Sequence, residues 1–427
     1  MKNSMLKTTL KNALGSQLPI KNEMAEALQL WSALYEKNSG LNLAAAISSE
    51  IARMVTLELS SKISGSTRAD FLNQRYSELI DSIRTPIEYG CAKGGLVFKP
   101  YVADGRLNID CVQADSFFPI SFDNQGRITD ALFIERETQG NAYYTRIERH
   151  TLSGGKYTVT NKAYKSFSKD IPGVQTELSS VNKWSGLGEE LVIDHVKHPL
   201  FGYFKPALAN NIDPHSPLGV SVFANAVSLI EDAEQQYKRL IWEFESGERA
   251  VFANSMAFRM DKSGKPKLPD KRLYRTIDVE DMDFFREWSP QFREASIASG
   301  LDRIFRQIEF CCGLAHGTLS DISNSEKTAE EIRASKQRSF STVSDNQKSL
   351  RKALSDLVYA MDVWCTLYNL APMGKYSISF DFDDSIIADR SLEFNEKYKL
   401  LEAGIMKPYE FRMWYFGEDE ETAKKTI

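Results

Sequence analysis

One long helical pattern with two unequal halves limits the fold more than any other feature. Residues 326–370 are predicted to form a single helix, roughly 65 Å long if continuous. In its N-terminal half, residues 326–349, only Ile332, Phe340 and Val343 are large and apolar. Such a helix has little to bury in its own chain, so it has to face solvent, a neighbouring subunit or a ligand. Its C-terminal half carries an ordinary core stripe: Leu350, Leu354, Leu357, Val358, Met361, Cys365 and Tyr368.

A polar loop, residues 316–325, precedes this helix. Its residues are mostly small and polar, so we expect it to contribute little to a core, and Gly317 gives its backbone freedom. Ser325 is a predicted N-cap for the helix that follows. The helix itself is biased toward positive charge, with six basic residues and one acidic residue between Arg333 and Lys352.

Composition sets broad limits on the class of protein. The 427 residues are 42% hydrophobic and 26% charged, which predicts roughly two to four compact units. A net charge of −5 excludes a bulk nucleic-acid coat, although local basic patches can still contact DNA. The five cysteines lack metal-type spacing and indicate free thiols in a reducing compartment. We expect neither a signal peptide nor a membrane span.

The first half of the chain changes from helical to extended patterns. Residues 23–38 and 42–62 are predicted helices, and a third begins at Asp70. Residues 94–196 then read as short strands separated by turns such as Asp104-Gly105. This pattern predicts an antiparallel meander or a small β-domain.

The second half places two helices around an extended segment. Residues 219–247 and 290–314 are the predicted helices, and residues 248–285 between them look extended. Within that segment, residues 259–275 hold seven basic and two acidic residues, and Gly264 marks a hairpin turn. The pattern fits either a docking surface or a solvated hairpin whose lysines protect a sheet edge.

Catalytic constellations are weak. Asp381, Asp383 and Asp384 form an acidic cluster that suits Mg²⁺, but no nearby residues complete a nuclease-like set. His195 and His198 lie three residues apart without a further ligand. No phosphate-binding loop, nucleophile elbow or zinc-protease motif occurs. The sequence therefore predicts no enzyme, no metal and no cofactor.

Four stretches resemble the portal proteins of tailed bacteriophages, in particular those of long-tailed phages that infect Gram-positive hosts. They occur in the family's order, at residues 94–120, 216–247, 288–332 and 386–404. The second contains SPLG at the start of a predicted helix, and the third contains the polar loop. One departure is KTAEE at residues 327–331, where the family favours KTATE.

The resemblance implies an α+β portal fold with a helical stem, an extended clip, a β-rich insertion in the wing and a long kinked tunnel helix. It divides the chain as follows: 1–93, N-terminal helical part of the wing; 94–215, β-rich wing; 216–247, first stem helix; 248–287, clip; 288–314, second stem helix; 315–325, tunnel loop; 326–370, tunnel helix; 371–427, C-terminal wing and short crown.

The resemblance also implies a function. A portal is a ring, of twelve subunits in this family, that forms the channel at one capsid vertex through which double-stranded DNA is packaged and ejected. The implied partners are further copies of the chain, the terminase large subunit, head–tail adaptors, and the major capsid and scaffolding proteins. The protein would be assembled in the host cytoplasm and reside in the virion. Neighbours in such a ring would cover the under-buried helix, and low positive charge would let DNA slide.

The site residues that follow from this assignment form two groups. The expected DNA-channel residues are His316, Thr318, Ser320, Asp321, Ser323, Asn324, Lys327, Glu330, Arg333 and Lys336. The expected clip residues for partner docking are Lys262, Lys265, Lys267, Lys271 and Arg272. Two alternatives stay open. One is another phage head or adaptor protein that binds nucleic acid, and the other is a metal-dependent DNA-processing enzyme that uses Asp381, Asp383 and Asp384.

Overall fold

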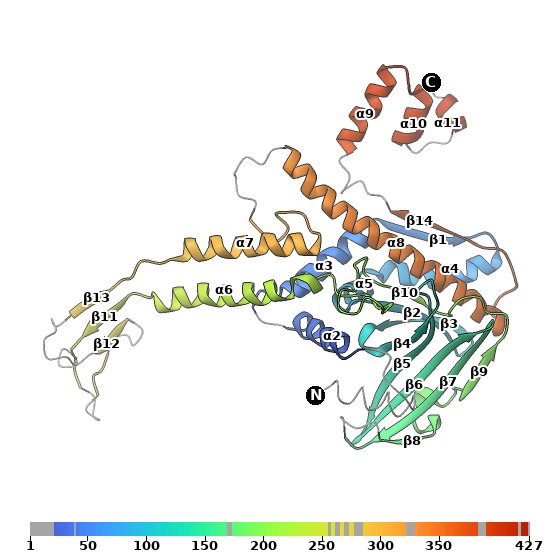
Figure 1. The fold of residues 1–427 in the computed structure, drawn as a ribbon, viewed down its shortest axis with the longest axis horizontal. Helices are drawn as coiled ribbons and strands as arrows, with labels where there is room; N and C mark the ends of the chain where they lie inside the picture. The colour runs from blue at the N-terminus through green and yellow to red at the C-terminus, as the bar shows by residue number, and fades with distance from the viewer. Residues whose placement is uncertain are drawn as a thin grey trace.

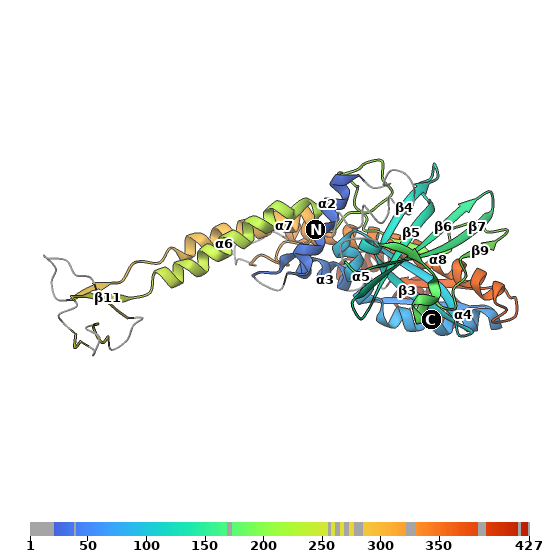
Figure 2. The same ribbon diagram turned by 90° about the horizontal axis from the view of Figure 1, so that it is seen from below.

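The chain folds into a body of helices and sheets from which a stem of two helices projects (Figure 1). In the view from below, the same two helices again run side by side away from the body (Figure 2). The structure is a computed structural model, and it describes residues 21–37, 40–168, 173–254, 258–260, 265–268, 273–276, 285–321, 329–382, 390–416 and 420–425.

Four helices open the described chain: α2 (Asn22–Tyr35), α3 (Leu43–Thr56), α4 (Thr67–Ser82) and α5 (Arg84–Lys93). Pro86 lies in the first turn of α5, where a missing backbone N–H leaves no helical bond unmade. Ser66 caps α4 by accepting a hydrogen bond from the N–H of Ala69.

The predicted helix over 42–62 is wrong at its C-terminal end. Residues Leu59–Ser64 form strand β1, which pairs antiparallel with β14 (Ser377–Phe382) in a two-stranded sheet. Ile63 lies opposite Ile378 in the register. The partner strand is more than 300 residues away in sequence, so tertiary pairing overrides the local helical pattern here.

The predicted antiparallel meander is confirmed, as two sheets. In the smaller sheet, β2 (Leu96–Ala103) lies between β10 (Gly202–Phe204) and β3 (Arg106–Gln113). The turn between β2 and β3 uses Asp104 and Gly105, both with positive φ, as tight hairpins require. The larger sheet contains β4 (Phe117–Phe122), β5 (Ile128–Gln139), β6 (Ala142–Ser153), β7 (Lys156–Ser166), β8 (Val174–Thr176) and β9 (Glu190–Ile193).

Helix α8 (Ala329–Leu367) organises the body. Its predicted core stripe is confirmed from Leu350 to Cys365, since residues such as Leu354 and Leu357 are fully buried in the main core. Burying each such side chain contributes about 1.5–3 kcal/mol. The prediction is wrong at Tyr368, which is 49% exposed and follows the last residue of the helix. Strand β10 crosses α8 so closely that a Cβ on Gly202 would collide with the backbone carbonyl of Ala353. The kink in this helix stays a prediction.

The stem consists of α6 (Val227–Ser246) and α7 (Glu294–Cys312). Helix α6 starts eight residues later than predicted, because a short 3₁₀ turn, η4 (Ala224–Ala226), comes before it. Gly313 ends α7 in the left-handed conformation, at φ 69°. The far end of the stem carries a small sheet in which β11 (Ala250–Ala253) lies between β12 (Tyr274–Thr276) and β13 (Phe285–Trp288).

The chain ends in three short helices: α9 (Arg390–Glu402), α10 (Pro408–Phe416) and α11 (Glu420–Lys425). Gly404, with φ 69°, lies between α9 and α10 at a predicted break. An aromatic cluster that includes Phe394, Phe411 and Tyr415 holds α9 and α10 together.

Candidate channel loop and stem

The polar loop begins by wrapping around one buried carboxylate, that of Glu309 in the last turn of α7. The Oε1 atom of Glu309 accepts hydrogen bonds from the backbone N–H groups of Gly317 (3.1 Å), Leu319 (2.6 Å) and Ser320 (2.8 Å). The Ser320 hydroxyl donates at 3.0 Å to Oε2, and His316 donates through Nδ1 at 3.1 Å to the same atom. Glu309 is 0% exposed, so its charge is satisfied entirely by this segment.

The hydrogen bonds decide the charge state of Glu309. Burial raises the pKa of a carboxyl group, but the hydrogen bonds from Ser320, Leu319 and His316 outweigh it and hold the pKa of Glu309 below its usual range. Glu309 is therefore ionised at neutral pH. The negative end of the α7 dipole disfavours a charge at this position, so the donors from the loop have to compensate both the dipole and the burial.

The first half of the loop is anchored, which corrects the expectation that residues 316–325 contribute little to a core. Ser320 is 7% exposed, and Leu319 packs against the main core. The N–H of Asp321 donates at 2.9 Å to Oδ1 of Asp302, two turns before Glu309 on α7. The small, polar residues of this segment supply hydrogen-bond donors to Glu309. The sequence pattern did not show that this acceptor is buried.

The predicted channel residues divide into three groups. His316, Thr318 and Asp321 are exposed, whereas Ser320 is buried against Glu309. Glu330, Arg333 and Lys336 lie on α8, in a stretch for which the structure describes the backbone only. Ser323, Asn324 and Lys327 lie outside the described residues, so their place in a channel stays a prediction.

The basic segment at the far end of the stem reverses direction as a hairpin. Met260 and Pro266 form an antiparallel bridge, and the N–H of Lys267 donates at 2.7 Å to the carbonyl of Arg259. Lys265 and Lys267 are exposed. The other three predicted docking residues lie outside the described residues: Lys262, Lys271 and Arg272.

A second buried carboxylate joins the two stem helices near this far end. Glu243 of α6 accepts hydrogen bonds from Arg293, immediately before α7, through the backbone N–H at 2.9 Å and through Nη2 at 2.8 Å. Hydrogen bonds from the Arg293 side chain and backbone lower the pKa of Glu243. Phe244 and Phe292 lie beside this pair with ring centroids 5.8 Å apart.

A third buried carboxylate ties the near end of α6 to the N-terminal helices. Glu234 accepts hydrogen bonds from the backbone N–H groups of Leu41 (2.8 Å) and Asn42 (3.3 Å), and forms an ion pair with Lys37 at 3.2 Å. A Cβ on Gly40 would collide with this carboxylate. Sequence reasoning missed Glu234, Glu243 and Glu309. One feature of the sequence could have indicated Glu309. It is a charged residue that follows Phe305 by four residues, on a helix face that is otherwise apolar.

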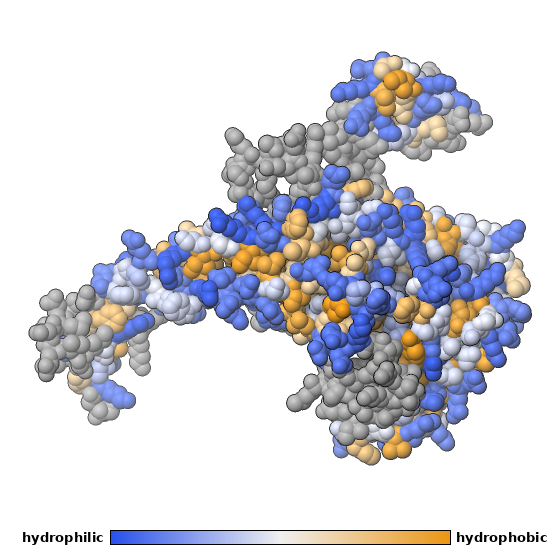
Figure 3. Space-filling view, viewed as in Figure 1, coloured by the Kyte–Doolittle hydropathy of each residue, from blue (hydrophilic) through white to orange (hydrophobic). Residues whose placement is uncertain are grey.

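The stem leaves large apolar side chains uncovered within this chain. On α6, Trp242 is 60% exposed, and on α7, Phe310 is 57% exposed. Most of the first two turns of α7 are also exposed. The space-filling view shows apolar side chains gathered along the stem, between hydrophilic ones (Figure 3). Two helices that cover each other so thinly need further partners for their apolar surface.

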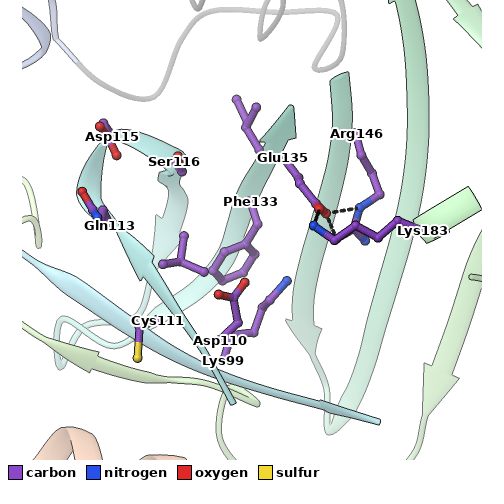
Figure 4. A pocket seen from close by; sticks show the side chains of 12 residues that line it. Lys99, Asp110, Cys111, Gln113, Asp115, Ser116, Phe133, Glu135, Arg146 and Lys183 are labelled. Atoms are coloured by element: carbon purple, nitrogen blue, oxygen red, sulfur yellow. Dashed lines mark hydrogen bonds and ion pairs between the residues drawn. The ribbon is translucent and has the colours of Figure 1, made fainter. Parts of the chain in front are cut away.

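A charged cavity lies between the two antiparallel sheets (Figure 4). Arg146 and Lys183 both pair with Glu135, at 2.7 and 2.6 Å, as the dashed lines in Figure 4 show. Deeper in, Lys99 pairs with Glu148 at 2.7 Å. These three cations that line the cavity are therefore compensated by carboxylates of the same chain, and the cavity serves the fold.

The remaining sequence candidates that the structure describes do not meet in a site. Asp381 is exposed on β14, and Asp383 and Asp384 lie outside the described residues. His198 contacts Arg127 at 3.2 Å. Among the described residues, no group of three possible metal ligands converges. In the same part of the chain, no helix is both long enough and apolar enough to cross a membrane.

A two-helix stem with exposed aromatic side chains projects from the body, and such uncovered apolar surface is typical of a subunit of a larger assembly. Comparison with protein families identifies that assembly. Residues 81–425 match the family described as "Phage portal protein, SPP1 Gp6-like". The chain belongs to this family, whose members are structural components of the phage head and form an oligomeric ring through which DNA passes. The comparison with curated proteins gave no match.

The match covers most of the chain, so the portal function predicted from the sequence is confirmed. The two alternatives gain no support from it: another phage head or adaptor protein that binds nucleic acid, and a metal-dependent DNA-processing enzyme.

Proposed function

We propose that this chain is one subunit of a twelve-membered ring at a single capsid vertex, and that the genome enters and leaves the head through the ring. The observation that carries the ring is the uncovered stem. Aromatic side chains such as Trp242 and Phe310 are more than half exposed in the single chain. Repeating one subunit around a closed axis brings identical stems together, so a neighbour can cover these side chains.

A variant of the stem tests this step. Trp242→Ser removes the most exposed aromatic side chain of α6, and Tyr101→Ser is the control, because Tyr101 is an exposed aromatic residue (42%) on wing strand β2. We expect Trp242→Ser to shift purified protein from rings toward smaller species in sedimentation, and Tyr101→Ser to leave the rings intact. Equal ring masses for both variants and the natural protein would remove the stem from the subunit interface.

We further propose that the channel wall is formed by residues 316–325 and the N-terminal half of α8. Two features support this placement. The segment before Asp321 is held against α7, and α8 has little apolar surface before Val343. In the loop, exposed Thr318 and Asp321 present polar groups without positive charge, so these residues do not add to the basic bias of α8, which suits DNA that has to slide. Dense cationic contacts would release counterions and hold the duplex in place.

The clip, residues 248–287, is the proposed docking surface for the terminase large subunit and for head–tail adaptors. Lys265 and Lys267 are exposed on a hairpin at the end of the stem, where they add little to the core. Replacing both with Ser is expected to leave the melting temperature nearly unchanged and to weaken motor or adaptor binding in a pull-down. A large loss of melting temperature would show that the hairpin is a structural element.

The direct test of DNA passage uses phage heads assembled with this chain as their only portal. Such heads are expected to contain DNA, and heads assembled without it are expected to be empty. Heads that fill equally well without the chain would contradict the proposed function.

A further inference from the structure

Burying the charge of Glu309 costs free energy unless the loop is held in the one conformation that supplies its hydrogen bonds. Glu309 is fully buried at the C-terminal end of a 19-residue helix, where the helix dipole disfavours negative charge. Removing a carboxylate from water costs several kcal/mol unless strong hydrogen bonds replace the water. In this chain the replacement consists of donors from residues 316–320.

The donors come from one short stretch, so a single carboxylate fixes the path of the backbone. Three backbone N–H groups, those of Gly317, Leu319 and Ser320, converge on one oxygen atom of Glu309. Gly317 has φ 94°, a conformation that other residues rarely adopt. Charge-assisted hydrogen bonds of this kind are about twice as strong as neutral ones.

The anchored segment continues along α7 and is also linked to α8. Asp302 accepts a hydrogen bond from the N–H of Asp321, so the chain is still held to α7 at Asp321, within the proposed channel wall. On the other side, the Thr342 hydroxyl of α8 donates at 3.1 Å to the carbonyl of Gly313. Arg338 of α8 lies over the Phe310 ring, 4.6 Å from its centroid.

We propose that Glu309 is the positioning residue of the channel loop. Its carboxylate fixes residues 316–320 against α7 and thereby positions the exposed Thr318 and Asp321 of the proposed channel wall. This inference rests on the proposed function of that loop. Glu309 is buried and does not touch DNA, so it acts on DNA passage only through the backbone that it holds.

The experiment compares Glu309→Ala, the near-isosteric Glu309→Gln, and the control Glu294→Ala, an exposed acidic residue in the first turn of the same helix. Amide hydrogen exchange is measured on the assembled full-length protein. In Glu309→Ala the amides of residues 317, 319 and 320 are expected to exchange at least about tenfold faster. Glu309→Gln keeps one acceptor oxygen, so its exchange rates should lie between those of Glu309→Ala and those of the natural protein. Glu294→Ala should exchange at the same rates as the natural protein.

The second readout is packaged DNA in heads that contain each variant, with the ring mass as a check on assembly. We expect both Glu309 variants to keep the ring mass, and the amount of packaged DNA to fall in the order of the exchange rates. If Glu309→Ala does not fold, the near-isosteric variant is expected to show the same two effects at smaller size.

Three outcomes overturn the inference, two of which concern amide exchange. One is faster exchange with unchanged packaging, and the other is exchange that stays slow at residues 317, 319 and 320. Loss of the ring in Glu309→Gln would make the residue an assembly element and would also overturn it. Failure of the natural protein to support packaging would instead count against the proposed function, so the two failures are distinguishable.

Discussion

Replacing Glu148 with Ala should strongly destabilise the six-stranded sheet, because this carboxylate on β6 joins three buried groups. It accepts hydrogen bonds from Lys99 Nζ at 2.7 Å and from His150 Nε2 at 2.6 Å, and it forms an ion pair with Arg146 Nη1 at 2.9 Å. Lys99 is 6% exposed, so its ammonium group cannot turn to water when Glu148 is removed, whereas Arg146 keeps its ion pair with Glu135. The ion pairs from Lys99 and Arg146 and the hydrogen bond from His150 hold the pKa of Glu148 well below its usual range, although burial raises it.

The magnitude follows from leaving a buried charge unpaired. Breaking a buried ion pair by removing one partner costs about 3–5 kcal/mol of unfolding free energy. For a folding unit of about 150–250 residues, this loss lowers the melting temperature by roughly 6–20 °C. The control is Glu137→Ala on the same sheet. Glu137 pairs at 3.1 Å with Lys183, whose side chain is 63% exposed, and such a surface pair contributes about 0–1 kcal/mol.

The assay is thermal unfolding of the full chain followed by circular dichroism, with amide exchange on β6 to locate the change. A second variant, Lys99→Met in the Glu148→Ala background, is expected to recover part of the lost stability, because the unpaired ammonium is then gone. The reasoning is refuted if Glu148→Ala lowers the melting temperature no more than Glu137→Ala does, or if Lys99→Met lowers it further.

Three further predictions concern the wing and both ends of the stem. Burial lowers the pKa of His150 from 6.5 in the folded protein, so the unfolded chain takes up a proton at higher pH than the folded protein does. The free energy of unfolding should therefore fall as the pH drops below about 6.5. A melting temperature that does not change between about pH 7 and pH 5 would contradict this. In Gly40→Ala the backbone would have to keep a positive φ and the new Cβ atom would collide with the Glu234 carboxylate, so the free energy of unfolding in denaturant should fall by more than about 1 kcal/mol. Gly186→Ala is the control, because a Cβ atom there has no neighbour within 4 Å. Arg293→Ala should speed amide exchange at the far end of the stem, and unchanged exchange would count against the pairing.

The body of the fold was predictable where its determinants are local. The stripe containing Leu350 and Leu357 repeats at helical spacing, so it identifies a buried helix without further information. Strand β1 (Leu59–Ser64) was not predictable in the same way, because it exists through pairing with β14 near the other end of the chain. Local pattern therefore favoured a longer helix there.

The candidate site was predictable in outline and not in its anchoring. Polar composition marks residues 316–325 as a loop, but hydrogen bonding to a buried acceptor leaves no periodic trace in sequence. Glu309 and its donors are 7–11 residues apart in the chain and meet only because Gly313 and Gly317 turn the backbone. The sequence indicates only that a charged residue lies on the apolar face of α7. The structure was needed to identify the groups that bind it.

Electron microscopy of the purified full-length protein tests the central claim most directly. We expect closed rings of about twelve times the subunit mass of 48.4 kDa, with the stems side by side. The central channel should admit duplex DNA, and the N-terminal half of α8 should lie on its wall. A compact monomer at micromolar concentration and moderate salt, or a ring whose channel wall is formed by the six-stranded wing sheet, would contradict the account.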